Sequence, residues 1–237
     1  MYHPLCVERH SLQSRALWTL CDYCHLWLFQ VAENDEGGKG MKAVVLANGA
    51  YPSHDIPLRI LQEAETVVCC DGAANEYIRR GGVPTAIVGD GDSVDPRHRL
   101  LLHRVEEQDD NDLTKAVHYF KEQGIKEVDI LGATGKREDH TLGNISLLIE
   151  YLKEGIEARM FTDEGVFLPC LDNAEIEGLE IGQPISIFNF GATGFQFDGL
   201  RYPLYDFSNW WQGTLNEAVS EKVSIRAKGY FLVFLTY

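Results

Sequence analysis

The chain of 237 residues contains no apolar run long enough to cross a bilayer and no excess of positive charge. A membrane-spanning helix needs about 20 largely apolar residues, so we expect no membrane span. Lysine and arginine together number 21 against 36 aspartate and glutamate residues, which gives a formal net charge of −15 at pH 7. Because such a surface repels a phosphate backbone, we expect no nucleic-acid partner.

Cysteine is also scarce, with six residues in the whole chain. This number is too small for a disulfide scaffold, and Cys69 and Cys70 lie inside an apolar run that predicts a buried strand. We therefore expect reduced thiols and a cytoplasmic location. Cys21 and Cys24, followed by His25, match a haem-attachment pattern, but no convincing export signal surrounds them, and we interpret the match as chance.

The familiar signatures of nucleotide-binding and hydrolytic enzymes are missing. The chain has no P-loop, no glycine-rich dinucleotide fingerprint, no protein-kinase signature and no Gly-x-Ser-x-Gly elbow. Hydrophobic residues make up 45% of the chain and charged residues 24%, which is the composition of an ordinary globular protein with a substantial core. A catalytic site, if present, must therefore be built from other motifs.

The composition divides the chain into three segments. Residues 1–40 form a leader of unknown role, which ends in a polar run and which we expect to be poorly ordered or outside the fold. Residues 41–172 alternate β-rich and helical patterns, which predicts an α/β domain with a parallel sheet. Residues 173–237 carry alternating segments punctuated by glycine and proline, which predict a small antiparallel β-sandwich.

Apolar periodicity predicts the individual helices and strands. An apolar stripe over 113–120 predicts a helix that Asn111 or Asp112 caps. A second stripe over 142–152 predicts a helix that ends at Gly155. The predicted strands are Val44–Ala47, Val67–Cys70, Ala86–Val88, Val128–Leu131 and Ala158–Phe161 in the α/β segment, and Pro184–Phe188, Lys222–Arg226 and Tyr230–Phe234 in the last segment.

Aspartate is concentrated where the predicted strands end. Asp71 directly follows the second strand, Asp90 and Asp92 follow the third, and Asp109–Asp112 opens the first predicted helix. Carboxyl ends of parallel strands meet at one edge of a sheet, so we expect these side chains to lie close together. Crowded carboxylates repel one another unless a divalent cation lies among them, and oxygen ligands suit Mg²⁺ that carries substrate phosphates. The pattern predicts a phosphoryl-transfer site.

Basic residues and glycines accompany these aspartates. Lys115 lies one helical turn beyond Asp112, and Arg137 lies in the loop after the fourth strand, so both can neutralise phosphate oxygens. The backbone N–H groups of 132–135 can bind the same phosphates. His140, at the start of the following helix, is either a general base or an orienting residue, and the sequence does not decide between the two.

Four segments, in this order and with roughly this spacing, resemble the motif series of the thiamin pyrophosphokinase (thiamin diphosphokinase) family. They are Asp71–Asn75, Gly89–Ser93, Asn111–Ala116 and Gly132–His140, and the resemblance extends from about Met41 to the C-terminus. It implies an N-terminal α/β domain, a C-terminal β-sandwich and a homodimer with two sites between the subunits. It also implies that pyrophosphate passes from ATP to thiamin with Mg²⁺ present, giving thiamin diphosphate and AMP.

The resemblance further implies roles for individual residues. The implied metal ligands are Asp71, Asp90, Asp92 and Asp112. The implied catalytic residues are Asp71, Asp92, Asp112, Lys115, Arg137 and Asp139. ATP is expected to contact Asp71, Asn75, Asp90, Asp92, Ser93, Asp112, Thr114, Lys115, Thr134 and Arg137. Thiamin is expected to contact Gln108, Asp139, His140, Phe197 and Asn216, with the ring of Phe197 stacked on the pyrimidine.

Three residues depart from the family pattern. Lys136 stands where the family usually has a second glycine, and Leu215 stands where it commonly has a serine of the presumed thiamin pocket. Gly91 fills a position that often holds a larger apolar residue. Two alternatives to a thiamin diphosphokinase stay open: a pyrophosphotransferase that acts on another small alcohol, which Leu215 suggests, and a nucleotide- or thiamin-binding regulator without turnover.

Overall fold

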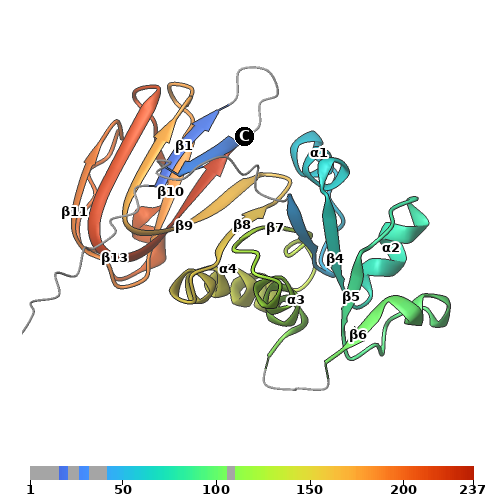
Figure 1. Ribbon diagram of the computed structural model, residues 1–237. Coiled ribbons are helices and arrows are strands. Elements are labelled where there is room, and N and C mark those ends of the chain that lie inside the picture. Colours follow the sequence, from blue (N-terminus) through green and yellow to red (C-terminus); the bar gives the residue numbers. More distant parts are fainter. Residues whose placement is uncertain (1–15, 21–26, 32–41, 106–109) are drawn as a thin grey trace, which may run out of the picture.

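The computed structural model describes residues 16–20, 27–31, 42–105 and 110–237 (Figure 1). Within this part of the chain no helix is both long and apolar enough to cross a membrane. The helices are α1 Asp55–Glu63, α2 Ala73–Arg79, α3 Asp112–Glu122 and α4 Glu138–Lys153, with short 3-10 segments η1 Pro96–Leu101 and η2 Trp210–Gly213. The strands are β1 Ala16–Leu20, β2 Trp27–Val31, β3 Ala43–Leu46, β4 Thr66–Cys70, β5 Ala86–Gly89, β6 Leu102–Arg104, β7 Glu127–Leu131, β8 Glu157–Phe161, β9 Gly165–Glu177, β10 Pro184–Asn189, β11 Thr193–Asp198, β12 Asn216–Glu217 and β13 Lys222–Thr236.

Six parallel strands form the first part of the sheet, in the order β8, β7, β3, β4, β5, β6. All five strands predicted in the α/β segment are confirmed to within one or two residues. The sixth strand, β6, was not predicted, because its three residues are too few to show a hydrophobic period. The carboxyl ends of β4, β5 and β7 therefore meet at one edge, as the parallel arrangement requires.

Helices cover both faces of this parallel sheet (Figure 1). Val44 of β3 belongs to a buried cluster with Leu61 of α1 and Ala73 of α2. The next residue, Val45, belongs to a second cluster that contains residues of α3 and α4. Because successive side chains of a strand point to opposite faces, α1 and α2 pack on one face and α3 and α4 on the other.

The two predicted helices are confirmed, with one difference in length. The side chain of Asn111 accepts a hydrogen bond from the Thr114 backbone N–H, so Asn111 rather than Asp112 caps α3. Helix α4 begins at Glu138, four residues before the predicted start, because its first turn is polar and falls outside the apolar stripe. Gly155 follows the C-cap of α4 with a φ of 77°, as expected of a glycine that ends a helix.

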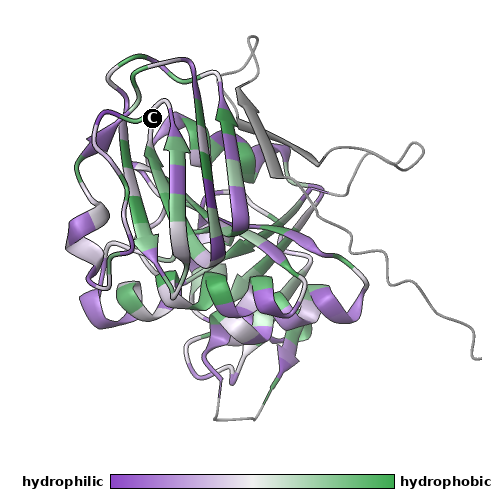
Figure 2. Ribbon diagram, turned by 90° about the vertical axis from the view of Figure 1, so that its left-hand side faces the viewer, coloured by the Kyte–Doolittle hydropathy of each residue, from purple (hydrophilic) through white to green (hydrophobic). Residues whose placement is uncertain are grey.

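Antiparallel strands form the C-terminal part, which confirms the predicted fold class (Figure 1). Strands β9 and β13 pair along most of their length, and β10 and β11 pair with different halves of β13. Hydrophobic and hydrophilic residues alternate along these strands (Figure 2). Apolar residues from both halves of β13, including Ile225 and Val233, belong to one buried cluster, as expected where a sheet folds over on itself.

Two of the predicted strands, 222–226 and 230–234, are parts of one long strand, β13. The regular pairing of β13 with β9 is interrupted between Arg226 and Tyr230, where the two strands bend. Gly229 has a φ of 121° there, and its N–H donates to Asp172 Oδ1 at 2.8 Å. The expected domain boundary after residue 172 falls within β9 at this bend.

Two short segments of the leader are described, and both are strands. Strand β1 pairs antiparallel with β2 and parallel with Glu175 and Ile176 of β9. Strand β8 pairs with β9 only at Val166 and Phe167. The same edge of β9 is therefore free of β8 near Glu175 and Ile176, where β1 can pair with it. The Cys21–His25 pattern lies outside the described residues.

Asp163, which lies between β8 and β9, ties this connection to the start of α1. It accepts hydrogen bonds from the Ser53 N–H at 2.9 Å and the His54 N–H at 3.0 Å, and a further one from the Ser53 hydroxyl. Partial burial alone would raise the pKa of Asp163, but these hydrogen bonds together outweigh it and hold the pKa below its ordinary value. The ionised carboxylate therefore stabilises this junction.

We predict that Asp163→Ala lowers the free energy of unfolding at pH 7 by about 2 kcal/mol, because it removes hydrogen bonds to a charged group. Since the folded-state pKa is depressed, this contribution is fully present above the ordinary pKa of about 3.9 and disappears as the pH falls through the folded-state value. Urea unfolding of both proteins at several pH values between 7 and 3 measures the difference. Glu164→Ala, at the exposed neighbouring residue, is the control; a difference independent of pH contradicts the prediction.

Candidate functional site

Two adjoining cavities lie at the carboxyl edge of the parallel sheet. The larger has a volume of about 500 Å³ and is lined by loops after β3, β5 and β7 and by the first turns of α3 and α4. The smaller, of about 390 Å³, lies between the end of β3 and helix α2. The predicted site residues that line the larger cavity are Asp90, Asp112, Lys115, Thr134, Arg137 and His140, and Asn75 lines the smaller one.

Three of the four predicted metal ligands form a compact acidic cluster beside the larger cavity. Asp71, Asp90 and Asp92 each place a carboxylate oxygen within 4.8 Å of those of the other two. Asp71 is 4% exposed, and its Oδ2 accepts a hydrogen bond from the Ser93 N–H at 3.1 Å. Its Oδ1 is buried and has no hydrogen-bond partner among the described residues. A buried carboxylate oxygen without a donor fits a bound cation, and three carboxylates suit Mg²⁺.

Asp112, the fourth predicted ligand, lies next to this cluster across Gly89. A Cβ atom at Gly89 would lie 2.9 Å from the Cβ of Asp71 and 3.4 Å from the carboxylate of Asp112. The φ of Gly89 is 155°, which residues with side chains rarely adopt. Glycine at the end of β5 is therefore what allows these two aspartates to approach each other.

The site sets different pKa values for its carboxyl groups. Burial raises the pKa of Asp71, and the neighbouring Asp92 and Asp112 raise it further, whereas the Ser93 N–H opposes this shift. The Ser93 hydroxyl donates to Asp92 at 2.7 Å and lowers the pKa of that exposed group. Burial also raises the pKa of Asp112, against the opposing effect of the Lys115 ammonium. Negative charge is thus costly at the buried positions without a cation.

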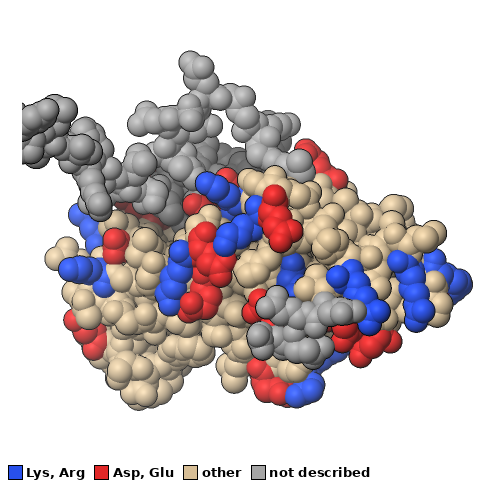
Figure 3. Space-filling model, turned by 60° about the horizontal axis from the view of Figure 1, so that its bottom comes forward, with Lys and Arg blue, Asp and Glu red and all other residues tan. Residues whose placement is uncertain are grey.

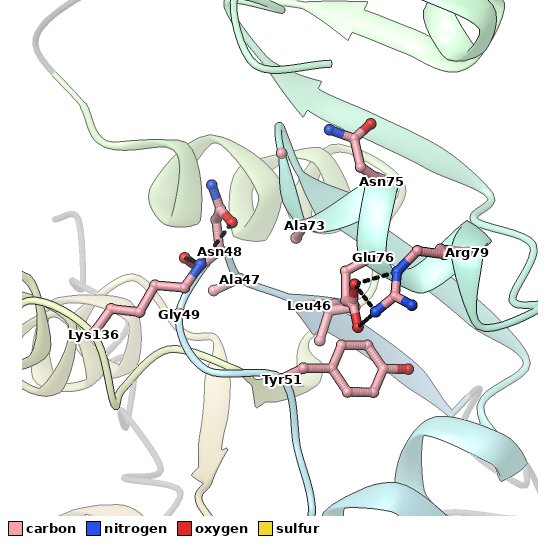
Figure 4. A pocket seen from close by; sticks show the side chains of 11 residues that line it. Leu46, Ala47, Asn48, Gly49, Tyr51, Ala73, Asn75, Glu76, Arg79 and Lys136 are labelled. Atoms are coloured by element: carbon pink, nitrogen blue, oxygen red, sulfur yellow. Dashed lines mark hydrogen bonds and ion pairs between the residues drawn. The ribbon is translucent and has the colours of Figure 1, made fainter. Parts of the chain in front are cut away.

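Three cations surround the larger cavity, and each has a different partner. Lys115 is buried, and its ammonium lies 3.4 Å from Asp112 Oδ1. The guanidinium of Arg137 is paired with Asp139, whose pKa it lowers to about 2. Lys136 donates instead to two oxygens of Asn48 (Figure 4).

On the molecular face in Figure 3, basic and acidic side chains are interspersed, although the net charge is −15.

Asn75, which lines the smaller cavity, and Thr114, which lines neither cavity, also make contacts that support the site. The Asn75 amide donates to Ser93 O at 2.7 Å and accepts from the Asp95 N–H, and so holds the loop that carries Asp92. The Thr114 hydroxyl is buried against Tyr151, 2.9 Å from its hydroxyl oxygen, and points to α4. Direct contacts between ATP and the side chains of Asn75 and Thr114 stay predictions.

Of the predicted thiamin residues that the structure describes, His140 lines the larger cavity and Asp139 is paired with Arg137, whereas Phe197 and Asn216 lie elsewhere. Phe197 is exposed on β11, and neither Phe197 nor Asn216 lines either cavity within the described residues. Asn216 is buried, accepts from the Tyr202 N–H at 3.0 Å and donates to Tyr202 O at 2.8 Å. Leu215 before it is highly exposed, with a φ of 63°. Gln108 lies outside the described residues.

The loop after β3 also contributes to the site, although it was not predicted from the sequence. Asn48 and Gly49 line both cavities. A Cβ atom at Gly49 would lie 2.3 Å from Gly132 O, so glycine allows this loop to approach the one after β7. The position of this loop directly after a buried strand could have indicated its role, as it did for the aspartates. The loop carries no charged residue, so its role was not predicted.

The fold and the site together define an α/β protein with an acidic cluster, beside a cavity that basic side chains line, at the carboxyl edge of its parallel sheet. A family model described as the catalytic domain of thiamin pyrophosphokinase matches residues 58–160, and one described as its substrate-binding domain matches residues 165–234. Together the two models cover most of the chain. The chain belongs to the thiamin pyrophosphokinase family.

Curated relatives and solved structures carry the same family name. A thiamine pyrophosphokinase of Bacillus subtilis is 30% identical over 137 residues, which span 52% of this chain and 63% of the relative. One of Caenorhabditis elegans is 32% identical over 103 residues, 38% of this chain and 42% of the relative. These alignments span less than two thirds of either relative.

Crystal structures of the family extend the comparison of the fold. The structure of the Bacillus subtilis protein aligns with a TM-score of 0.68 at 23% identity, over 82% of this chain and 98% of the other. The structure from Candida albicans aligns with a TM-score of 0.66 at 17% identity, over 82% and 88% of the two chains. At these identities the structures show that the fold is shared.

We predict that Asp71→Asn makes the metal-free protein more stable, by about 1 kcal/mol, because it removes a buried charge from a crowded acidic cluster. Magnesium should raise the melting temperature of the unsubstituted protein and leave that of the variant nearly unchanged. Thermal unfolding with a chelator and with excess Mg²⁺ measures both effects.

The matched control for this stability measurement is Asp55→Asn, in the exposed first turn of α1. We expect this variant to be no more stable than the unsubstituted protein in chelator and to retain its response to Mg²⁺. If Asp71→Asn were less stable than the unsubstituted protein without metal, the assignment of the cluster as a cation site would be wrong.

Proposed function

We propose that the protein is a thiamin diphosphokinase, which transfers pyrophosphate from ATP to thiamin and releases AMP. The observation that carries the proposal is the buried, unpartnered Oδ1 of Asp71 in its cluster with Asp90 and Asp92, beside a cavity that Lys115 and Arg137 line. The family supplies the identity of the substrates, ATP and thiamin. The proposed resident ion is Mg²⁺, held by Asp71, Asp90 and Asp92 with Asp112 nearby.

In the proposed step, the hydroxyl oxygen of thiamin bonds to the β-phosphorus of ATP. The bond between that phosphorus and the oxygen it shares with the α-phosphorus breaks, and the electron pair leaves with AMP. The hydroxyl proton passes to His140 if this residue is the base, or to water if His140 only orients thiamin. When bound, magnesium supplies charge neutralisation for the phosphate oxygens.

The residues of this chain supply binding and orientation for that step. The ammonium of Lys115 is directed at the partly exposed carboxylate of Asp112, and burial of the Lys115 side chain keeps the pair in place. Arg137 can exchange Asp139 for a phosphate oxygen, because both side chains are exposed. Asn75 and Ser93 hold the loop that carries Asp90 and Asp92, so we assign positioning roles to them.

The proposal is tested with purified full-length protein, Mg²⁺, ATP and thiamin, and chromatographic separation of the products. We predict equimolar thiamin diphosphate and AMP, and a loss of at least 100-fold in rate for Asp92→Asn, with Asp55→Asn near the unsubstituted rate. ADP with thiamin monophosphate would instead indicate ordinary kinase chemistry. Binding of ATP without any thiamin product would favour the transferase for another alcohol or the regulator without turnover.

We further propose that the two domains bind different substrates and that two subunits form each site. Residues 41–172 bind ATP and magnesium, residues 173–237 bind thiamin, and each site of a cytoplasmic homodimer lies between subunits. The separation of Phe197 from the larger cavity within one chain supports the shared site. The burial of the free thiols Cys69, Cys70 and Cys170 supports a reducing location.

A shared site predicts that two inactive variants complement each other. Mixing Asp92→Asn with Phe197→Ala, after dissociation and reassociation, should restore about a quarter of the unsubstituted activity, because half of the dimers then contain one intact site. Each variant mixed with itself is the control. Light scattering during chromatography measures the oligomeric state. A dimer without any recovered activity would place the whole site within one subunit.

A further inference from the structure

Lys136 occupies the junction between the two cavities. Four residues line both of them: Ala47, Asn48, Gly49 and Lys136. Lys136 is the charged member of this set. Figure 4 shows its side chain reaching the loop after β3, where the ammonium donates to Asn48 O at 3.0 Å and to Asn48 Oδ1 at 3.3 Å. A positive charge is thus held where one cavity opens into the other.

Both partners of this ammonium are neutral oxygens, unlike those of the other cations around the cavities. Arg79 is paired with Glu76 at 2.6 Å, and Arg137 with Asp139. Lys115 lies beside Asp112. A charged phosphate oxygen is a stronger acceptor for an ammonium than a carbonyl or amide oxygen. Because Lys136 is exposed, its ammonium can exchange Asn48 for a phosphate without losing a buried ion pair.

The smaller cavity has the chemistry of a site for an uncharged planar group. The ring of Tyr51, the side chain of Leu46 and that of Ala73 form apolar parts of its wall, and the Glu76 carboxylate lies on the same side as Arg79 (Figure 4). The wall combines these apolar side chains with the guanidinium of Arg79, which is held by Glu76, a carboxylate that also pairs with Arg80. It suits a nucleobase and its sugar, which need apolar contact and a few polar groups.

The larger cavity has the opposite character. Lys115 and Arg137 line it together with Asp112 and with Asp90 of the proposed metal site, which suits the two terminal phosphates of a nucleotide carrying Mg²⁺. A nucleoside triphosphate that lies across both cavities must place the phosphate next to its sugar at their junction. That phosphate, the α-phosphate, then lies at Lys136.

We propose that Lys136 is a catalytic residue that binds the α-phosphate of ATP and stabilises AMP as the leaving group. The proposal rests on the proposed function and identifies a contact within it. As the bond from the β-phosphorus to the bridging oxygen breaks, its electron pair stays on that oxygen, and the negative charge of the α-phosphate increases. An ammonium already placed there stabilises the developing charge.

The ammonium of Lys136 occupies the junction and leaves both cavities open.

Calorimetric binding of AMP and of adenosine to the full-length protein, without thiamin, tests the contact directly. We expect Lys136→Met to weaken AMP binding about tenfold and to leave adenosine binding unchanged, because adenosine has no phosphate. Lys136→Arg should restore AMP binding to within about threefold. Lys126→Met is the matched control, because Lys126 is exposed and precedes β7 at the opposite edge of the sheet; it should change neither affinity.

Steady-state rates then separate leaving-group stabilisation from simple binding. We expect Lys136→Met to lower kcat about tenfold or more while the KM for thiamin changes less than twofold. Unchanged AMP affinity, or an equal loss of AMP and adenosine affinity, would overturn the proposal. These binding results do not depend on turnover, so a protein that binds AMP through Lys136 but makes no thiamin diphosphate would refute the proposed function and not this contact.

Discussion

Mutual repulsion among carboxylates at one sheet edge is the constraint on which the organisation of this protein depends. Parallel strands bring Asp71 and the loop of Asp90 and Asp92 to the same place, and α3 adds Asp112. Burial raises the pKa of Asp71 and Asp112, so the fold opposes their ionisation. Such an arrangement costs stability without a cation, so the electrostatics of this edge favour the binding of one.

The rest of the edge compensates for this cost with contacts that fix the loops. Asn75 and Ser93 bind the backbone and side chains of the acidic loop, and Asn111 caps the helix that presents Asp112 and Lys115. Gly89 supplies the close approach that no other residue allows. The hydrogen bonds of Asp163 to Ser53 and His54 act at the same edge, where β8 ends and α1 begins. These contacts fix the loops and helix starts along the carboxyl edge.

The parallel sheet and the acidic cluster could be predicted because each leaves a local pattern. Apolar runs of strand length are separated by helical stripes, and an aspartate after such a run is visible in the sequence. The bend that merges two strands into β13 could not be predicted, because it depends on the contact between Gly229 and Asp172, 57 residues apart. The hydrogen bonds of Asn216 to the backbone of Tyr202 could not be predicted either, because only the folded chain brings these two residues together.

Thr114 and Lys115 are adjacent in α3 but have different surroundings. The hydroxyl of Thr114, whose contact with ATP stays a prediction, is buried against Tyr151 of α4. The same segment presents Lys115 to the cavity, because successive helical residues point about 100° apart. One turn of α3 therefore serves both purposes: Thr114 fixes the helix against α4, and Lys115 carries the charge. The position of the Lys115 ammonium depends on the packing of Thr114 against α4. The acidic edge and the helical layer behind it therefore form one functional unit.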